Sequence, residues 1–265
     1  MSPARVQGAG VELAYDEAGS GPSLLLVHGT ALTRLSWRET VEELGGTVRS
    51  IAYDRRGYGD SGAPEPYAGT TIEEQSEDAA LLLNGLEVAP AVVCGHSAGA
   101  IVALDLLLRH PGLVSGAVLI EPPLLSLSPS GAETLSAIRE GVEAAAREGG
   151  PEAGVEAFVE SQDGPSLLDS IGADRAGAIR ASARAAFADF GAANAWQFSR
   201  RELRATSAPV LVLRGSRSTP VYRDVAAAIA EVMGSAQLRE LDAGHIGPLD
   251  DPAGVAAAIR ELAAP

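Results

Sequence analysis

Residues 93–99 read VCGHSAG, a GxSxG sequence that directly follows an apolar, strand-like run and directly precedes an apolar, helix-like run. A serine in this position lies at a strained strand-to-helix turn, where the flanking glycines avoid collisions with neighbouring backbone. The helix that begins there directs free amides and the positive end of its dipole at the serine hydroxyl. The pattern predicts a nucleophile elbow, with Ser97 as the nucleophile and the N–H of Ala98 as a donor to a developing oxyanion.

Outside this stretch, short apolar runs alternate with longer helical patterns. Strands are predicted at residues 11–15, 23–27, 48–53, 91–94, 116–120, 210–213 and 237–241. Helices are predicted near residues 37–44, 71–86, 98–109, 221–233 and 252–262. This alternation is typical of an α/β fold with a mostly parallel, doubly wound sheet, whose chemistry lies at the carboxyl ends of the strands.

The alternation stops between residues 122 and 208. This segment is rich in alanine and helical in pattern, with breaks at Gly149-Gly150-Pro151 and at Gly164-Pro165. It is too long for a loop and therefore predicts an inserted helical cap. The predicted organisation is a core made of residues 1–121 and 209–265, with the cap at residues 122–208.

Composition excludes several classes of function. The 265 residues are 46% hydrophobic, enough for a large core, and the formal charge of −15 argues against binding to nucleic acid or to an anionic membrane surface. The single cysteine, Cys94, excludes an intramolecular disulfide. No run has the length of a signal peptide or a membrane span, so we expect a cytoplasmic protein without membrane contact. A composition with arginine but no lysine favours a GC-rich bacterial source.

Three further motifs follow predicted strands. His28-Gly29-Thr30 comes after the strand at 23–27, where the backbone N–H of Thr30 can serve as a second oxyanion donor. Asp54-Arg55-Arg56-Gly57 follows the next strand, and Gly244-His245 follows the last one. Together with the GxSxG sequence, these motifs resemble the α/β-hydrolase family over nearly the whole chain, in particular its serine esterases and haloperoxidase-like hydrolases.

The resemblance implies a catalytic triad in the chain order nucleophile, acid, histidine. Ser97 matches the family nucleophile and His245 the family base. The physical chemistry agrees with this pairing. A serine hydroxyl is a weak nucleophile at neutral pH, and an imidazole with a reference pKa of about 6.5 can take its proton during attack.

The acid departs from the commonest family pattern. Family members usually carry aspartate a few residues past the glycine that is here Gly215, and this chain has Ser218 at that position. A hydroxyl cannot neutralise the imidazolium that forms in the transition state, so another carboxylate is needed. Glu121 is the predicted acid because it ends the strand at 116–120, where certain haloalkane dehalogenases place theirs.

Other assignments of the acid stay open at this point. Glu121 could instead begin the cap as a solvated or ion-paired residue. Asp224 and Asp242 are the remaining carboxylates near the expected place in the chain. Asp224 falls in the following helix and Asp242 is very close to His245 in sequence, so neither has obvious reach to the imidazole ring.

Five side chains are candidates for the walls of a substrate pocket, either because they lie in or just beyond the motifs above or because they are aromatic residues of the predicted cap. They are His28, Trp37, His96, Phe158 and Trp196. The four histidines show no metal-ligand spacing, so we expect neither a metal nor another cofactor.

The motifs and the resemblance predict a hydrolase that cleaves a small ester, lactone or thioester with an apolar acyl part through an acyl-enzyme. Perhydrolases, carbon–carbon bond hydrolases and lyases of the same fold share this layout. A non-hydrolytic ligand-binding or tailoring scaffold is a further alternative, favoured by Ser218. Dehalogenases and epoxide hydrolases of this fold use an aspartate nucleophile, so Ser97 argues against both. The expected partner is a small-molecule substrate, and the sequence is compatible with a homodimer.

Overall fold

The structure, a computed structural model, describes residues 3–264. Its centre is an eight-stranded sheet with the strand order β1-β2-β4-β3-β5-β6-β7-β8. The strands are β1 (Ala4–Gln7), β2 (Glu12–Ala18), β3 (Ser23–Val27), β4 (Arg49–Tyr53), β5 (Ala91–His96), β6 (Val114–Ile120), β7 (Val210–Gly215) and β8 (Ala236–Leu241). All neighbouring pairs from β4 to β8 are parallel, whereas β1 and β2 run antiparallel at the edge. The predicted fold class is confirmed.

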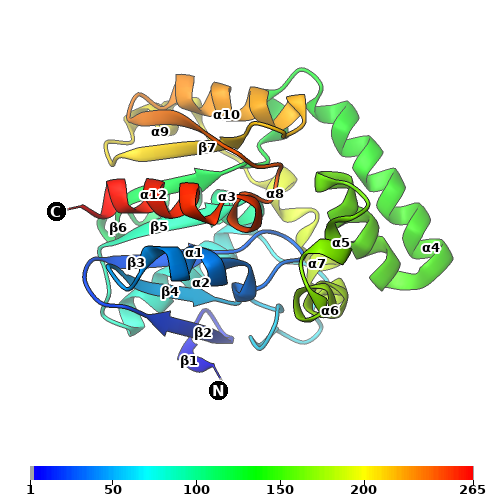
Figure 1. Cartoon of the computed structure of the whole chain (residues 1–265), viewed down its shortest axis with the longest axis horizontal. Coiled ribbons are helices and arrows are strands. Elements are labelled where there is room, and N and C mark those ends of the chain that lie inside the picture. The colour runs from blue at the N-terminus through cyan, green and yellow to red at the C-terminus, as the bar shows by residue number, and fades with distance from the viewer. Residues whose placement is uncertain (1–2, 265) are drawn as a thin grey trace.

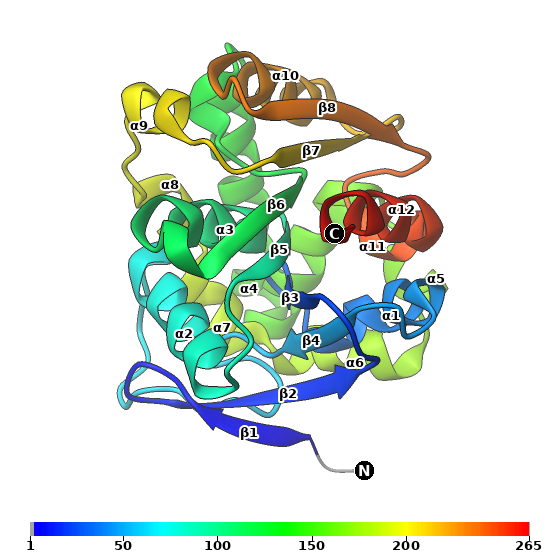
Figure 2. The same ribbon diagram turned by 90° about the vertical axis from the view of Figure 1, so that its left-hand side faces the viewer.

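Two layers of helices cover the sheet. Figure 2 shows α1 (Arg38–Leu44) and α12 (Pro252–Ala263) on one face, with α2 (Ile72–Gly85) and α3 (Ala98–Arg109) on the other. The helix α10 (Pro220–Val232) packs beside β7 and β8. Period-two alternation explains how one strand serves both layers. In β3, Leu24 and Leu26 join the apolar cluster under α1 and α12, while Leu25 and Val27 join the cluster under α2 and α3.

Sequence patterning misses the first strand. β1 pairs with β2 through the register Ala4↔Tyr15 to Gln7↔Glu12, but three of its four residues are exposed. An edge strand with a charged Arg5 and no buried face gives no apolar alternation to detect. The strand expected at 11–15 is found at Glu12–Ala18, because its second half pairs with β4 in spite of being exposed.

The segment between β6 and β7 forms the insert, a set of helices. They are α4 (Gly131–Asp163), α5 (Leu167–Ser170), α6 (Ala173–Ala181), α7 (Ala183–Asp189), α8 (Ala192–Ala195) and α9 (Arg200–Ala205). Figure 1 shows α4 to α7 stacked beyond one end of the sheet. The break expected near Gly150 exists, because Gly150 has a φ of 85° that interrupts α4. Whether residues 122–208 fold as a separate unit stays a prediction.

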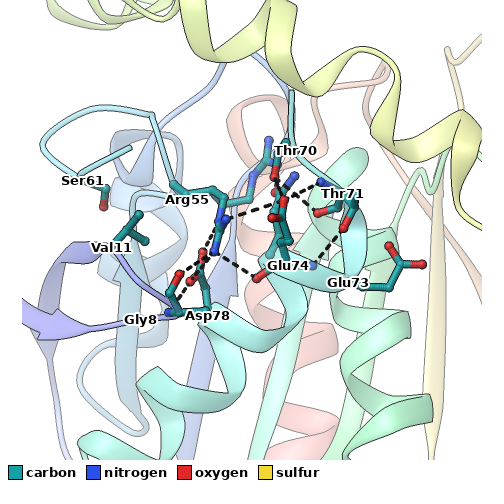
Figure 3. A network of polar contacts seen from close by, with 12 residues as sticks. Gly8, Val11, Arg55, Ser61, Thr70, Thr71, Glu73, Glu74 and Asp78 are labelled. Atoms are coloured by element: carbon teal, nitrogen blue, oxygen red, sulfur yellow. Dashed lines mark hydrogen bonds and ion pairs between the residues drawn. The ribbon is translucent and has the colours of Figure 1, made fainter. Parts of the chain in front are cut away.

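A polar network fixes the loop after β4 against the start of α2. The Arg56 guanidinium and the backbone N–H of Ala9 both donate to Asp78, with Nε to Oδ2 and N to Oδ1 distances of 2.7 Å each. Thr71 and Glu74 close a capping box that begins α2 (Figure 3). These contacts hold the loop after β4 in a fixed position at the carboxyl end of the sheet.

Among residues 3–264, no helix has the length and apolar character needed to cross a membrane.

Candidate active site

The GxSxG turn has the backbone that its glycines predict. Ser97 lies at φ 52° and ψ −124°, between the end of β5 and the start of α3. A Cβ on Gly95 would lie 2.2 Å from the Gly99 carbonyl oxygen, and a Cβ on Gly99 would lie 2.3 Å from the Val27 oxygen. Both contacts are far too short for any side chain. The strained serine is therefore held out at the carboxyl end of the sheet, as a nucleophile elbow requires.

Three predicted residues meet at this end of the sheet although they are distant in sequence. Ser97 Oγ lies 3.0 Å from His245 Nε2, and His245 Nδ1 lies 3.3 Å from Glu121 Oε2. Ser97 follows β5, Glu121 follows β6, and His245 follows β8. All three residues are buried, with at most 5% of their surface exposed. Serine, imidazole and carboxylate thus form one line of polar contacts away from bulk water.

Glu121 is anchored by more than the imidazole. Its φ of 49° turns the chain sharply after β6, and its Oε1 accepts from the Gly215 N–H at 2.7 Å. Its Oε2 also accepts from Ser218 Oγ at 2.7 Å. Ser218, at the position where aspartate is usual, therefore binds the carboxylate that lies beside His245. Sequence reasoning identified Glu121 but did not foresee this partnership.

The two fallback carboxylates lie elsewhere. Asp224 accepts a hydrogen bond from Ser128 at 3.2 Å. Asp242 is highly exposed and pairs with Arg217. In the part of the chain that the structure describes, neither carboxylate contacts the ring of His245.

The two residues predicted to donate to an oxyanion lie beside the nucleophile. Thr30 and Ala98 line the same cavity as Ser97. Within residues 3–264, neither N–H has a hydrogen-bond partner. Ala98 is the first residue of α3, so its N–H is one of the donors that a helix start leaves free. This geometry is suited to holding an oxyanion.

A buried carboxylate from the insert supports the turn at Thr30. Asp189, the last residue of α7, accepts from Thr30 Oγ1 at 2.7 Å and from Gln75 Nε2 at 2.7 Å, and it pairs with Arg55 at 2.9 Å. Burial raises the pKa of Asp189, but the Arg55 charge and these hydrogen bonds outweigh it and hold the pKa below its usual value. Asp189 therefore stays charged.

His28, at the same turn, is held by hydrogen bonds to the main chain. His28 Nδ1 donates to the Gly29 carbonyl at 2.8 Å, and its Nε2 accepts from the Arg55 N–H at 2.9 Å. Burial, together with the nearby charge of Arg55, lowers the pKa of His28 well below its usual value. His28 is thus a neutral ring that links two loops.

His96, inside the elbow, contacts the main chain of His245. Its Nε2 lies 2.9 Å from the His245 carbonyl oxygen, while its buried Nδ1 has no partner among the described residues. The carbonyl can only accept, so Nε2 carries the proton. Burial, reinforced by the charge of His245, lowers the pKa of His96 to about 3. His96 is neutral across the physiological pH range.

This depressed pKa predicts a measurable dependence of stability on pH. Unfolded His96 titrates near 6.5 and folded His96 near 3, so below pH 6.5 the unfolded state binds more protons and stability falls. Between pH 7 and pH 5 we expect the wild type to lose about 2 kcal/mol more free energy of unfolding than His96→Gln. Urea unfolding of both proteins at the two pH values measures this. Equal losses of free energy of unfolding in the two proteins would mean that the His96 ring is solvated in the folded state.

A cavity of about 640 Å³ opens above Ser97. Its wall comes mainly from the insert and includes Phe158, Phe187 and Phe190. Tyr222 of α10 also lines the cavity, and its ring lies 4.2 Å from the His245 ring, centroid to centroid. The predicted pocket residue Phe158 is therefore in place, and Tyr222 is a lining residue that the sequence did not single out.

Three of the predicted pocket residues, His28, Trp37 and Trp196, do not line this cavity. His28 is fully buried between loops, as described above. Trp37 packs in the apolar cluster under α1 and α12. Trp196 donates from Nε1 to Asp105 at 2.8 Å and stacks on Phe198. The two indoles bury a large apolar area in the protein core, whereas hydrogen bonds to the main chain hold the His28 imidazole.

His96 is an intermediate case. It borders a narrow space beside Ser97 and His245 and does not line the large cavity. The residue is 2% exposed, so its contacts are with the protein. Within residues 3–264, no group of histidine, cysteine, aspartate and glutamate side chains could hold a metal ion.

Comparison with known proteins agrees with this fold. A model described as the alpha/beta hydrolase family matches residues 24–258. The uncharacterized hydrolase YraK of Bacillus subtilis (strain 168) is 37% identical over 122 residues, which are 46% of this chain and 45% of that protein. The match thus spans less than half the length of this curated relative.

Two solved structures resemble nearly the whole chain. A thermophilic esterase from Thermogutta terrifontis superposes with a TM-score of 0.80 at 27% identity, covering 98% of this chain and 97% of that one. The esterase RhEst1 from Rhodococcus sp. ECU1013 superposes with a TM-score of 0.78 at 26% identity, covering 99% and 98%.

Proposed function

This chain belongs to the alpha/beta hydrolase family, and on that premise we propose that it is a serine hydrolase that cleaves a small ester, lactone or thioester with an apolar acyl part. The observation that carries the proposal is the line of contacts from Ser97 Oγ to His245 Nε2 at 3.0 Å and from His245 Nδ1 to Glu121 Oε2 at 3.3 Å. These contacts support roles for Ser97 as the nucleophile, His245 as the base and Glu121 as the orienting acid of acyl transfer.

The first half of the reaction forms an acyl-enzyme. Ser97 Oγ attacks the substrate carbonyl carbon while His245 Nε2 takes the hydroxyl proton. Glu121 holds the Nδ1 proton of His245 and stabilises the imidazolium. The carbonyl oxygen becomes an oxyanion that accepts from the N–H groups of Thr30 and Ala98. His245 then gives its proton to the leaving group as the bond between the carbonyl carbon and that group breaks.

The second half restores the enzyme. A water molecule attacks the ester carbonyl of acylated Ser97, and His245 takes the water proton. The same two amides hold the second oxyanion. When the tetrahedral intermediate collapses, His245 returns the proton to Ser97 Oγ and the carboxylic acid leaves. Besides the substrate and water, the proposed steps use only residues of this chain.

The cavity supports an apolar acyl part. Phe158, Phe187, Phe190 and Val142 contribute apolar surface to the space that begins at Ser97. Burying such surface contributes roughly 25 cal/mol per Å² of area removed from water. The esterases with similar structures are in line with this substrate class.

The alternatives differ in how well they are supported. A non-hydrolytic scaffold was favoured by the serine at position 218, but Ser218 donates to Glu121 at 2.7 Å, so its presence is compatible with a working acid. Perhydrolysis, carbon–carbon bond hydrolysis and lyase chemistry use the same polar residues. No contact in the site favours one of them over ester cleavage.

The acyl-enzyme gives the proposal its test. Mixing the protein with excess 4-nitrophenyl butyrate should release a burst of one nitrophenolate per active site, followed by slower turnover. Intact-mass measurement of a quenched sample should show one added butyryl group, located by peptide mapping on the segment with Ser97. Butyrylation of another residue, or a burst that persists in Ser97→Ala, would contradict the acyl-enzyme route.

A further inference from the structure

Three consecutive amides of the loop that carries His245 are bound by carboxylates. The Gly244 N–H donates to Asp250 at 2.7 Å, and the His245 N–H donates to Asp163 Oδ1 at 2.5 Å. The Ile246 N–H donates to the other oxygen of Asp163 at 2.8 Å. Asp250 is nearby in the chain, but Asp163 is the last residue of α4 in the insert. The insert therefore holds the main chain of His245 directly.

The approach of Asp163 depends on a glycine. A Cβ on Gly244 would lie 1.9 Å from Asp163 Oδ1, so any side chain there would push the carboxylate away. On the other side of the same loop, the His245 carbonyl accepts from His96 at 2.9 Å. The N–H and the C=O of His245 are thus both held by polar side chains that do not react themselves.

The charge of Asp163 also supports the role of His245 as a base. Burial raises the pKa of Asp163 above its ordinary value, and the positive charge of protonated His245 and the two amide hydrogen bonds offset only part of that rise. The attraction between an ionised Asp163 and the imidazolium is mutual, so it favours proton transfer to His245. Carboxylate acceptors of backbone N–H groups make strong, short hydrogen bonds, which restrict the motion of the loop.

We propose that Asp163 is a positioning residue, which fixes the backbone of His245 so that Nε2 faces Ser97 throughout the reaction. The inference rests on the proposed function. The insert would then have two roles. It lines the pocket, and its residue at the end of α4 holds the main chain of the catalytic base. Misplacing a catalytic group by about 1 Å can cost 100-fold in rate even when substrate binding is intact.

Asp163→Asn tests the inference. The amide keeps one acceptor oxygen but turns an N–H group toward a backbone N–H, so one of the two hydrogen bonds is lost. With 4-nitrophenyl butyrate as the probe, we expect kcat to fall about 10- to 100-fold while KM stays within about twofold of the wild type. Asp169→Asn is the matched control, since Asp169 is an exposed acid of the insert, and it should keep wild-type kcat.

A second variant leaves the carboxylate intact. Gly244→Ala should displace Asp163 by crowding and reproduce the loss of kcat with little change in KM. Far-ultraviolet circular dichroism supplies the folded fraction by which each rate is normalised. A purely structural role would lower the folded fraction and leave normalised kcat unchanged in both variants, and that result would overturn the inference.

The outcomes separate this inference from the function on which it rests. A reactive wild type with reduced kcat in Asp163→Asn and Gly244→Ala supports both. A reactive wild type whose two variants keep normal kcat overturns the positioning role alone. A raised KM with normal kcat also overturns it, because Asp163 would then act on substrate binding. A wild type that neither turns over the ester nor reacts with a fluorophosphonate overturns both.

Discussion

Ser97→Ala is expected to lower kcat for 4-nitrophenyl butyrate by about 10⁶-fold, and His245→Ala by a similar factor. The serine supplies the only bond to the acyl group, and without the imidazole its hydroxyl proton has no acceptor at 3.0 Å. The double variant should be about as slow as either single one, because the two side chains act as a unit. Stopped-flow and long-incubation assays cover the range of rates.

Matched substitutions away from the site serve as controls. Ser170→Ala removes an exposed serine of α5, and His110→Ala removes a histidine that contacts Glu77 beyond the end of α3. Both should keep the wild-type rate. If Ser97→Ala retained more than a small fraction of the wild-type kcat, another residue would have to be the nucleophile.

Glu121→Gln is expected to lower kcat by about 10⁴-fold. The oxygen of the new side-chain amide should keep the hydrogen bond from the Gly215 N–H, so the NH₂ group of that amide would face His245 Nδ1. The ring nitrogen would then have to accept, which places the imidazole proton on Nε2 and leaves no base for Ser97. The fold should survive, since the substitution preserves shape. A normal kcat would disprove the assignment of Glu121 as the acid.

The neighbouring serine offers a rescue experiment. Ser218 Oγ lies 2.7 Å from Glu121 Oε2, so an aspartate at position 218 would carry its charge close to the imidazole. In the Glu121→Gln background, Ser218→Asp should therefore recover part of the lost rate. Ser218→Ala alone removes one hydrogen bond to a charged group and should cost about tenfold, equivalent to about 1.4 kcal/mol. Recovery by Ser218→Asp would identify a missing negative charge as the cause of the loss.

Those parts of the fold that depend on local patterns could be predicted from the sequence. Apolar runs such as residues 91–94 locate the central strands, because parallel strands are buried on both faces. The glycines around Ser97 locate the elbow, because a Cβ on Gly95 or Gly99 would lie only 2.2 to 2.3 Å from a backbone oxygen. The exposed edge strand β1 carries neither signal, and it was missed.

The remaining parts of the site depend on long-range packing. Asp163 and Asp189 reach the loops of His245 and Thr30 only because the insert packs against the end of the sheet that carries these loops, and no motif marks either residue. Trp37 and Trp196 were predicted to line the pocket but are buried elsewhere in the protein. Trp37 follows a motif and Trp196 belongs to the predicted cap, and both positions favoured a pocket. Large aromatic rings are more often buried in a core, and sequence position does not show which way a ring points.

Fluorophosphonate labelling tests the central claim most directly, because the probe reacts with an activated serine whatever the natural substrate is. The second-order rate of labelling should be compared for the wild type, Ser97→Ala, His245→Ala and Glu121→Gln. The account predicts rapid labelling of the wild type at Ser97 and its loss in all three variants. A wild type that is not labelled, or labelling that persists in Ser97→Ala, would contradict a Ser97, His245 and Glu121 triad.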